Sequence, residues 1–350
     1  MANTKKISDL RVGTKLMDDI YSPQGQKIIS KGTVLNWQHL KDLYQLGLQE
    51  VMVNLPEDAP AIDAASTLGQ TKVVSTMTGV VEAYHDMFEG IRGSREMDPE
   101  TIEQCVKRLY SEVLDCFNLV AYFRAFKGNS DYISDHSVAV SAISMQIGLI
   151  LGYDEKSIKE LGTASLLHDI GKALLAPQLT ARAYPLSQVE VEEMAKHPLL
   201  GVKLVSPLYG ANSRISMGIL QHHEKMDGTG YPLGSTSGDI PELARIIAVA
   251  NLFDNLISGS HNGQRHSDYQ AAEELGKSTF GQTDPRICRQ FLEYLATFYV
   301  GNIVKLNTGD IGEVLRVDPT EPTRPLIRIG EKYVDLRSNR SLIIEEVVGY

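Results

Sequence analysis

The segment HHEKMDGTGYP at residues 222–232 sets two histidines side by side and follows them with a loop that contains two glycines and a proline. The segment HDIGK at residues 168–172 sets another imidazole beside a carboxylate. Neutral imidazoles, together with a carboxylate whose two oxygens can bridge two cations, suit Fe, Mn, Zn or Ni better than Ca or Mg. The sequence therefore predicts a transition-metal site. Five of the nine histidines fall at positions that make sense as one group, namely His136, His168, His197, His222 and His223.

The composition is that of a folded, acidic protein. Of the 350 residues, 43% are hydrophobic and 22% are charged, and the formal net charge is -10. An acidic chain repels phosphate backbones, so binding along a stretch of DNA is not expected. A local pocket that supplies metal ions or a few cations can still hold a small anionic nucleotide.

Neither the N-terminus nor the cysteines indicate secretion. The start MANTKKISDL lacks the apolar core of a signal peptide, and no run approaches the ~20 apolar residues that span a bilayer. We therefore expect a cytoplasmic protein without membrane insertion. The cysteines Cys105, Cys116 and Cys288 are too few for a disulfide framework and lack the spacing of metal ligands, so we interpret them as small hydrophobic residues of a reduced core.

The residue pattern at the start of the chain predicts a small α+β module. Residues 1–55 contain short β-leaning runs broken by the turn SPQG at 22–25, then a short helix and a strand. Residues 56–70 are rich in Pro, Ala and acidic residues, which indicates a linker.

The rest of the chain is mainly α, with connecting helices over 71–130 and the histidine-containing domain over 131–350. Apolar residues recur at spacings of three and four through 74–88 and again through 102–120. These faces can pack within the chain or against a second copy, so a homodimer is left open. Strand-like runs predict a short β-rich tail from about residue 300. Further helices are expected around 136–152, 155–167, 187–206, 213–222, 241–258 and 285–299.

Several segments together match one known family. They are DYISDHS (131–137), HPLLG (197–201) and GDIPELARIIAVANLFD (238–254), with HDIGK, HHEKMDGTGYP and the β-rich tail. On these residues, and over roughly residues 120–340, the chain resembles the HD-GYP proteins, the branch of the HD phosphohydrolase superfamily associated with hydrolysis of cyclic di-GMP. The resemblance implies an HD-type helical bundle behind a small accessory module.

Carried over to matching positions, the family pattern implies a centre with two divalent metal ions, Fe or Mn in preference to Zn or Ni. Asp169 would bridge the ions, and Lys172 would offset charge on the scissile phosphate. A hydroxide activated by both ions would cleave cyclic di-GMP to linear pGpG or to GMP. Gly230, Tyr231 and Pro232 would form a wall of the nucleotide pocket or a docking surface for signalling proteins. The implied metal ligands are His136, His168, Asp169, His197, His222, His223 and, in place of the usual aspartate, Asn251.

Three positions depart from the family pattern. Asn251, in VANLFD, stands where the family has an aspartate ligand, and it offers only a neutral carbonyl oxygen. Asp254 can face the same side of the helix and support a ligand. Tyr132 stands where some relatives carry a glutamate for a third ion, so a third ion is not expected. Residues 257–270 replace an Arg-Pro-Tyr segment, and Arg265 is the arginine found there.

Two functions of different classes follow from these features. The first is a metal-dependent cyclic di-GMP phosphodiesterase, weakened by the neutral side chain of Asn251. The alternative is a degenerate HD-GYP module that binds nucleotide or protein partners with little or no turnover. Asn251 and the altered 257–270 segment favour the module, whereas the intact HDIGK segment and the histidine pair favour the enzyme. Another phosphodiester or nucleotide substrate is a third option.

Overall fold

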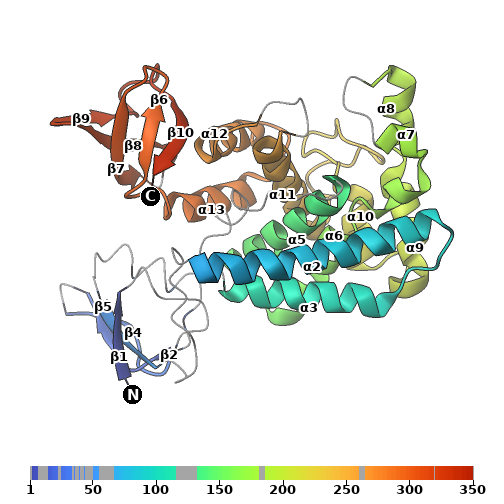
Figure 1. Cartoon of the computed structure of the whole chain (residues 1–350), viewed down its shortest axis with the longest axis horizontal. Coiled ribbons are helices and arrows are strands. Elements are labelled where there is room, and N and C mark those ends of the chain that lie inside the picture. The colour runs from blue at the N-terminus through green and yellow to red at the C-terminus, as the bar shows by residue number, and fades with distance from the viewer. Residues whose placement is uncertain are drawn as a thin grey trace.

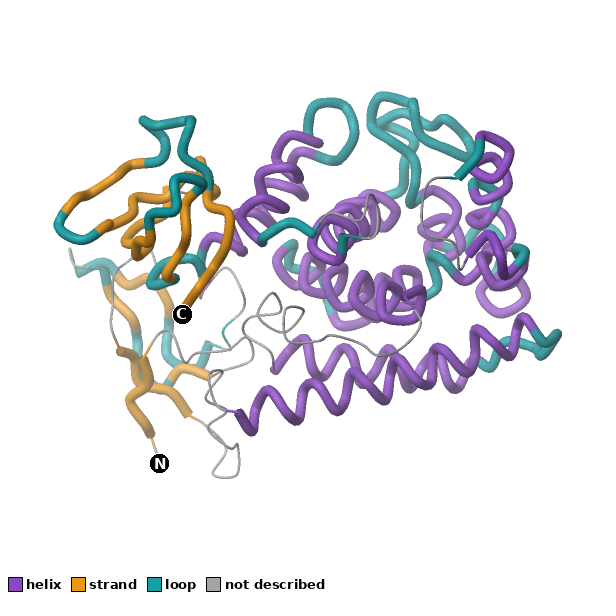
Figure 2. The backbone as a smooth tube through the Cα atoms, turned by 45° about the horizontal axis from the view of Figure 1, so that its top comes forward, coloured by secondary structure: helices purple, strands orange, loops and turns teal. Residues whose placement is uncertain are grey.

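Helices form the body of the protein (Figures 1 and 2). The computed structural model describes residues 2–6, 15–22, 25–33, 35, 39, 43, 50–54, 67–115, 132–180, 186–259, 265–318 and 320–349. Its helices are α2 (Thr67–Arg92), α3 (Pro99–Asp115), α5 (Tyr132–Ile150), α6 (Glu155–Leu166), the 3-10 helix η2 (Ile170–Leu174), α7 (Pro177–Thr180), α8 (Gln188–Met194), α9 (His197–Tyr209), α10 (Arg214–Gln221), α11 (Glu242–Ser258), α12 (Asp268–Ser278) and α13 (Pro285–Ala296).

Helix α5 is the core helix of this bundle. Its residues from Ile133 to Gly148 are buried, apart from Asp135. An 18-residue stretch of α5 is apolar enough to cross a membrane, but 83% of that stretch is buried inside the protein. The neighbouring helices therefore take up the apolar surface of α5.

The two predicted apolar stripes lie on α2 and α3 and pack within the chain. The side chains of both stripes join residues of α5 and α6 in one hydrophobic cluster. The end of the second stripe, Phe117 and Val120, lies outside the described residues, as does Cys116. The buried members are Met77, Val81, Tyr84 and Phe88 on α2 and Ile102, Val106, Leu109 and Val113 on α3.

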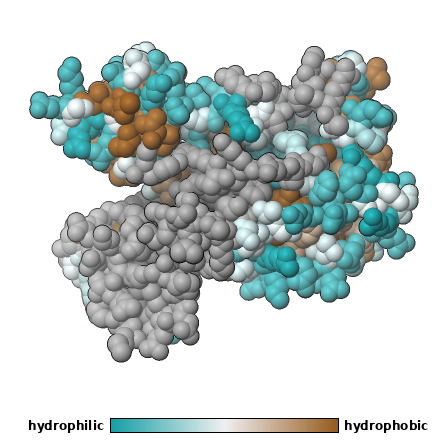
Figure 3. Space-filling model, viewed as in Figure 1, coloured by the Kyte–Doolittle hydropathy of each residue, from teal (hydrophilic) through white to brown (hydrophobic). Residues whose placement is uncertain are grey.

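The predicted β-rich tail is a five-stranded antiparallel sheet in the order β10-β6-β7-β8-β9, drawn in orange and red in Figure 1. In the space-filling view of Figure 3, apolar side chains gather over this sheet, whereas the visible surface of α2 and α3 is largely hydrophilic. The strands are β6 (Ile303–Leu306), β7 (Ile311–Asp318), β8 (Glu321–Ile329), β9 (Lys332–Asp335) and β10 (Ile344–Gly349).

Short strands form two small sheets near the N-terminus. One has the order β1-β5-β2, and β3 pairs with β4. At the predicted turn, Gly25 N–H donates to Ser22 O at 2.9 Å and Gly25 has a φ of +82°, a conformation that favours glycine. The predicted short helix falls mostly outside the described residues. The strands are β1 (Ala2–Lys6), β2 (Lys15–Leu16), β3 (Ile20–Tyr21), β4 (Lys27–Ile29) and β5 (Glu50–Asn54).

Two predicted boundaries differ from the structure, and one helix was not predicted. The single helix expected at 187–206 is divided into α8 and α9, with Pro198 in the first turn of α9, where its missing N–H costs no hydrogen bond. Helix α2 begins at Thr67, inside the predicted linker. Helix α12 was not predicted, although Ser267 and Gln270 form a capping box at its start.

The described cysteines behave as predicted. Cys105 and Cys288 are free and buried, and burial raises the pKa of each thiol to about 11. Because the thiolate is the reactive form, both side chains are inert near neutral pH.

Candidate metal centre

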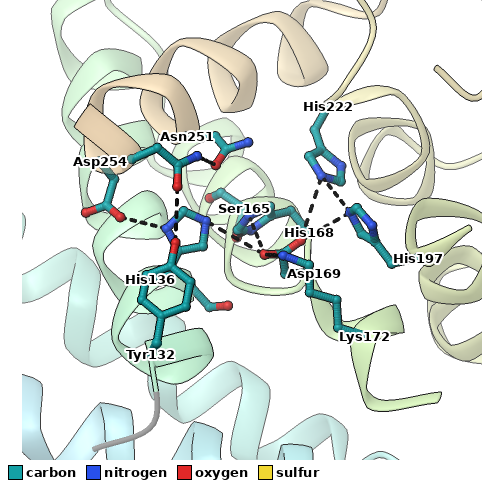
Figure 4. A network of polar contacts seen from close by, with 12 residues as sticks. Tyr132, His136, Ser165, His168, Asp169, Lys172, His197, His222, Asn251 and Asp254 are labelled. Carbon is teal, nitrogen blue, oxygen red and sulfur yellow. Dashed lines mark hydrogen bonds and ion pairs between the residues drawn. The ribbon is translucent and has the colours of Figure 1, made fainter. Parts of the chain in front are cut away.

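Separate helices bring the predicted ligands to one buried point, shown in Figure 4. His136 comes from α5, and His168 and Asp169 lie in the turn between α6 and η2. His197 is the first residue of α9, and His222 follows the last residue of α10. The four imidazoles surround the carboxylate of Asp169.

Each oxygen of Asp169 faces its own set of imidazole nitrogens. Oδ2 lies 3.7 Å from His136 Nε2 and 3.5 Å from His168 Nε2. Oδ1 lies 3.2 Å from His197 Nε2 and 4.0 Å from His222 Nε2. We call these the Oδ2 group, made of Asp169 Oδ2, His136 and His168, and the Oδ1 group, made of Asp169 Oδ1, His197, His222 and His223. Within each group the potential ligand atoms lie within 4.8 Å of one another.

Three histidines are oriented by the helix that ends just before them. His168 Nδ1 contacts Ser165 O, His197 Nδ1 contacts Met194 O and His222 Nδ1 contacts Ile219 O, each at 2.7 Å. The last carbonyls of a helix have no partner within the helix, so they are free to accept these N–H groups. A ring whose Nδ1–H donates to a carbonyl keeps its Nε2 lone pair for a metal ion.

Several atoms of the centre lack partners that a cation would supply. His197 Nε2 and His222 Nε2 lie 3.3 Å apart. Because both rings donate through Nδ1, two lone pairs face each other and repel unless a cation lies between them. His168 Nε2 and Asp169 Oδ1 are buried without a hydrogen bond in the described part of the chain. Buried polar atoms rarely lack partners, so these residues fit divalent metal ions.

Burial favours the neutral form of His168, His222 and His223. It lowers the pKa of His168 to about 3 and holds the pKa of His222 and of His223 well below the ordinary value. Burial alone would raise the pKa of Asp169, but the Lys172 ammonium and the neighbouring imidazoles hold it well below its usual range. Neutral imidazoles and an ionised carboxylate are the forms that bind metal ions.

These pKa shifts predict that the metal-free protein loses stability in acid. In the unfolded chain histidines bind protons below about pH 6.5, whereas the buried ones stay neutral, down to about pH 3 for His168. Unfolding in this window takes up protons, so lowering the pH favours the unfolded state. We expect the free energy of unfolding, measured with urea after chelation, to be at least about 2 kcal/mol lower at pH 5 than at pH 7.

A variant of the centre provides the control for this experiment. His168→Gln removes one of the imidazoles whose pKa burial lowers, so it should make the difference between pH 5 and pH 7 smaller. Equal or greater stability at pH 5 in the unmodified chain would contradict the neutral, buried state of the imidazoles.

Comparison with known proteins shows what the chain is similar to. A family model described as an HD domain matches residues 124–287. The fold is similar to that of Bd1817, an HDG"Y"P protein from Bdellovibrio bacteriovorus, with a TM-score of 0.52 and 21% identity over 83% of this chain and 98% of that chain. The chain therefore contains a segment that matches the HD domain, within a fold similar to that of an HDG"Y"P protein.

Several relatives of this chain are named phosphodiesterases. A cyclic di-GMP phosphodiesterase of Pseudomonas aeruginosa is 27% identical over 75% of this chain and 66% of its own length. The cyclic di-GMP phosphodiesterase PdeB of Borreliella burgdorferi is 27% identical over 59% of this chain and 55% of its own length. A 3'3'-cGAMP-specific phosphodiesterase of Vibrio cholerae is 28% identical over 50% of this chain and 34% of its own length. The chain thus spans less than two thirds of each of these relatives.

The loop at residues 228–235, which we call the GYP loop, folds back onto the histidine pair. A Cβ added at Gly230 would lie 2.4 Å from Glu224 Cα and 2.5 Å from His223 O, so only glycine fits there. Tyr231 stacks on the His223 ring at a centroid distance of 4.7 Å, and Pro232 follows through a cis peptide bond. The buried Glu224 carboxylate accepts two backbone N–H groups further along the loop, at 2.6 and 2.9 Å. The loop therefore lies beside the Oδ1 group.

Asn251 is buried on α11, and its carbonyl oxygen already has a donor (Figure 4). It accepts an N–H of Asn255 at 2.8 Å, and Asn255 Oδ1 accepts the hydroxyl of Tyr132 at 3.1 Å. Asp254 Oδ2 lies 2.6 Å from His136 Nδ1, so Asp254 supports a histidine, as the sequence predicted. The ring of Tyr132 also stacks on His136 at 5.5 Å.

Lys172 and Arg265 lie in different surroundings. The Lys172 ammonium is 2.5 Å from Asp169 Oδ2, so Lys172 contacts the carboxylate at the middle of the centre. Arg265 is exposed and donates through Nε to Ser258 O at 3.1 Å. Among the described residues, Arg265 has no contact with the centre.

Proposed function

We propose that this chain is a metal-dependent phosphodiesterase that hydrolyses cyclic di-GMP to linear pGpG or GMP. The observation that carries the proposal is the position of Asp169, with each oxygen directed at a separate set of imidazole nitrogens. A carboxylate between two ligand sets is the arrangement that a two-ion centre requires. The names of the relatives support the choice of a cyclic dinucleotide as substrate.

In this proposal the Oδ2 group would hold one divalent ion, with Asn251 beside it, and the Oδ1 group would hold the other. When bound, such ions lower the pKa of water and polarise phosphoryl oxygens. Fe or Mn is favoured, and Zn or Ni is compatible with the same ligands. Contacts at Nδ1 anchor His136, His168, His197 and His222, so their Nε2 atoms would be the ones that hold the ions.

Other side chains would act on the nucleotide directly. The Lys172 side chain is 18% exposed, so its ammonium can reach a phosphate at the edge of the centre and offset the charge that develops there. Gly230 lets the GYP loop approach closely, and the Tyr231 ring beside His223 would form a wall of the pocket that ends at Pro232.

The proposal extends to the organisation of the chain. Residues 131–350 would form the metal-dependent unit, joined through connecting helices at 71–130 and a linker at 56–70 to an accessory module at 1–55. A cytoplasmic location, docking of signalling proteins on the GYP loop and a homodimer belong to the same proposal.

A second candidate function is a binding module with little turnover. The observation that favours it is the engaged carbonyl of Asn251, which accepts an N–H of Asn255 at the position of the family's charged ligand. A neutral oxygen that already accepts a hydrogen bond offsets little of the positive charge of a second divalent ion.

Turnover and metal dependence separate the two functions. We expect the purified protein, supplied with Mn(II) or Fe(II), to convert cyclic di-GMP to pGpG or GMP, and chelation to lower the rate at least about a hundredfold. Chromatographic product analysis, with 3'3'-cGAMP as a parallel substrate, measures this. Hydrolysis that survives complete chelation would contradict the metal mechanism. Binding of cyclic di-GMP without hydrolysis at full metal loading would favour the module.

A further inference from the structure

The two oxygens of Asp169 differ in the partners that they contact. On the Oδ2 side, the Lys172 ammonium lies 2.5 Å from Asp169 Oδ2, closer than either imidazole nitrogen. On the Oδ1 side, Asp169 Oδ1 is buried and accepts no hydrogen bond in the described part of the chain. One carboxylate oxygen is therefore already neutralised by a cation of the protein, and the other is open.

Two further oxygens on this side of the centre also have partners. Asn251 Oδ1 accepts an N–H from Asn255, and Asp254 Oδ2 contacts His136 Nδ1. A divalent ion that enters the Oδ2 group would therefore meet three oxygens that already have partners, namely Asp169 Oδ2, Asn251 Oδ1 and Asp254 Oδ2. It would also lie within a few Å of the Lys172 ammonium, where repulsion between a divalent and a monovalent cation is strong.

We propose that Lys172 is an internal counter-ion that competes with the second metal ion for Asp169 Oδ2. The inference rests on the proposed two-ion centre and adds the order in which the two metal ions bind. The first ion binds the Oδ1 group tightly, and the second binds the Oδ2 group only after the ammonium leaves Oδ2. The side chain of Lys172 is 18% exposed, so the displaced ammonium can move to solvent or to a substrate phosphate.

Metal binding without substrate tests the competition. Metal-depleted protein is titrated with Mn(II), and free Mn(II) is followed by its paramagnetic resonance signal. The wild-type chain should bind one ion tightly and a second at least about tenfold more weakly. Lys172→Met removes the charge at similar length, so it should tighten the weaker site at least about tenfold and leave the tight site unchanged.

Two controls isolate the charge at this position. Lys172→Arg keeps the charge and should give no gain in the weaker site. Lys277 also pairs with a carboxylate three residues earlier, at 2.6 Å from Glu274, but it lies on α12 away from the centre. Lys277→Met should therefore leave both sites unchanged.

The outcomes separate this inference from the function on which it rests. Competition is contradicted if wild-type protein binds both ions equally tightly, or if Lys172→Met leaves the weaker site unchanged or weakens either site. If those results accompany metal-dependent hydrolysis of cyclic di-GMP, the proposed function stands and the inference fails. If wild-type protein binds no Mn(II), both fail.

Discussion

Asp169→Asn is expected to remove Mn(II) from both ligand groups and to lower the rate of cyclic di-GMP hydrolysis at least about a thousandfold. The two oxygens of Asp169 face separate imidazole groups, with Nε2 distances of 3.2–4.0 Å. An asparagine has one oxygen and one NH₂ group, so its NH₂ would donate to one group of Nε2 atoms and occupy their lone pairs. Its neutral oxygen would bind an ion at the other group weakly. Metal analysis of the purified variant and product analysis measure the two losses.

A buried aspartate outside the centre is the matched control for this variant. Asp268, at the start of α12, is buried, and burial raises the pKa of its carboxyl to about 8. At neutral pH that carboxyl is already mainly protonated, so Asp268→Asn should keep both metal ions and normal turnover. If Asp169→Asn also retained two ions per chain and normal turnover, Asp169 would not be the bridging ligand.

Gly171→Ala is expected to lower the free energy of unfolding by about 2–3 kcal/mol or more and to disrupt the metal centre. A Cβ at position 171 would lie 2.0 Å from His197 O and 2.5 Å from Gly201 N, so η2 and α9 would have to move apart. Asp169 immediately precedes η2, and His197 is the first residue of α9. The contact between η2 and α9 therefore sets the position of Asp169 relative to His197. Urea unfolding measures the stability, and Mn(II) titration measures the centre.

A glycine with space around it is the control for the effect of Gly171→Ala on the free energy of unfolding. Gly238 is exposed, has no atom within 4 Å of an added Cβ and does not need a positive φ. Gly238→Ala should therefore change the free energy of unfolding by no more than about 0.5 kcal/mol. If Gly171→Ala were as mild as Gly238→Ala, the close approach of η2 to α9 would not determine the geometry of the centre.

Residue types and spacings predicted much of this architecture. The apolar stripes of α2 and α3 are buried, and the strand-like runs after residue 300 form a sheet. Both patterns are set by local periodicity, which the sequence displays directly. The division of α8 from α9 was not predicted, because the residue types at 187–206 are also compatible with one continuous helix. In the structure Pro198 lies in the first turn of α9, a position that proline favours.

The structure brings the predicted histidines and Asp169 together, but their supporting contacts could not be predicted. His168, His197 and His222 are held by backbone carbonyls three residues earlier, and a carbonyl is present in every residue type. Which carbonyls are free depends on where the preceding helix ends, and helix ends are weakly marked in the sequence. The hydrogen bond from Tyr132 to Asn255 joins residues 123 positions apart, so it depends on the packing of α5 against α11.

Anomalous diffraction from crystals soaked in excess Mn(II) tests the central claim most directly, because it locates the ions without relying on turnover. We expect two peaks, one beside each oxygen of Asp169, with the stronger peak at the Oδ1 group of His197, His222 and His223. A single peak, or peaks that do not contact Asp169, would contradict a two-ion centre bridged by this carboxylate.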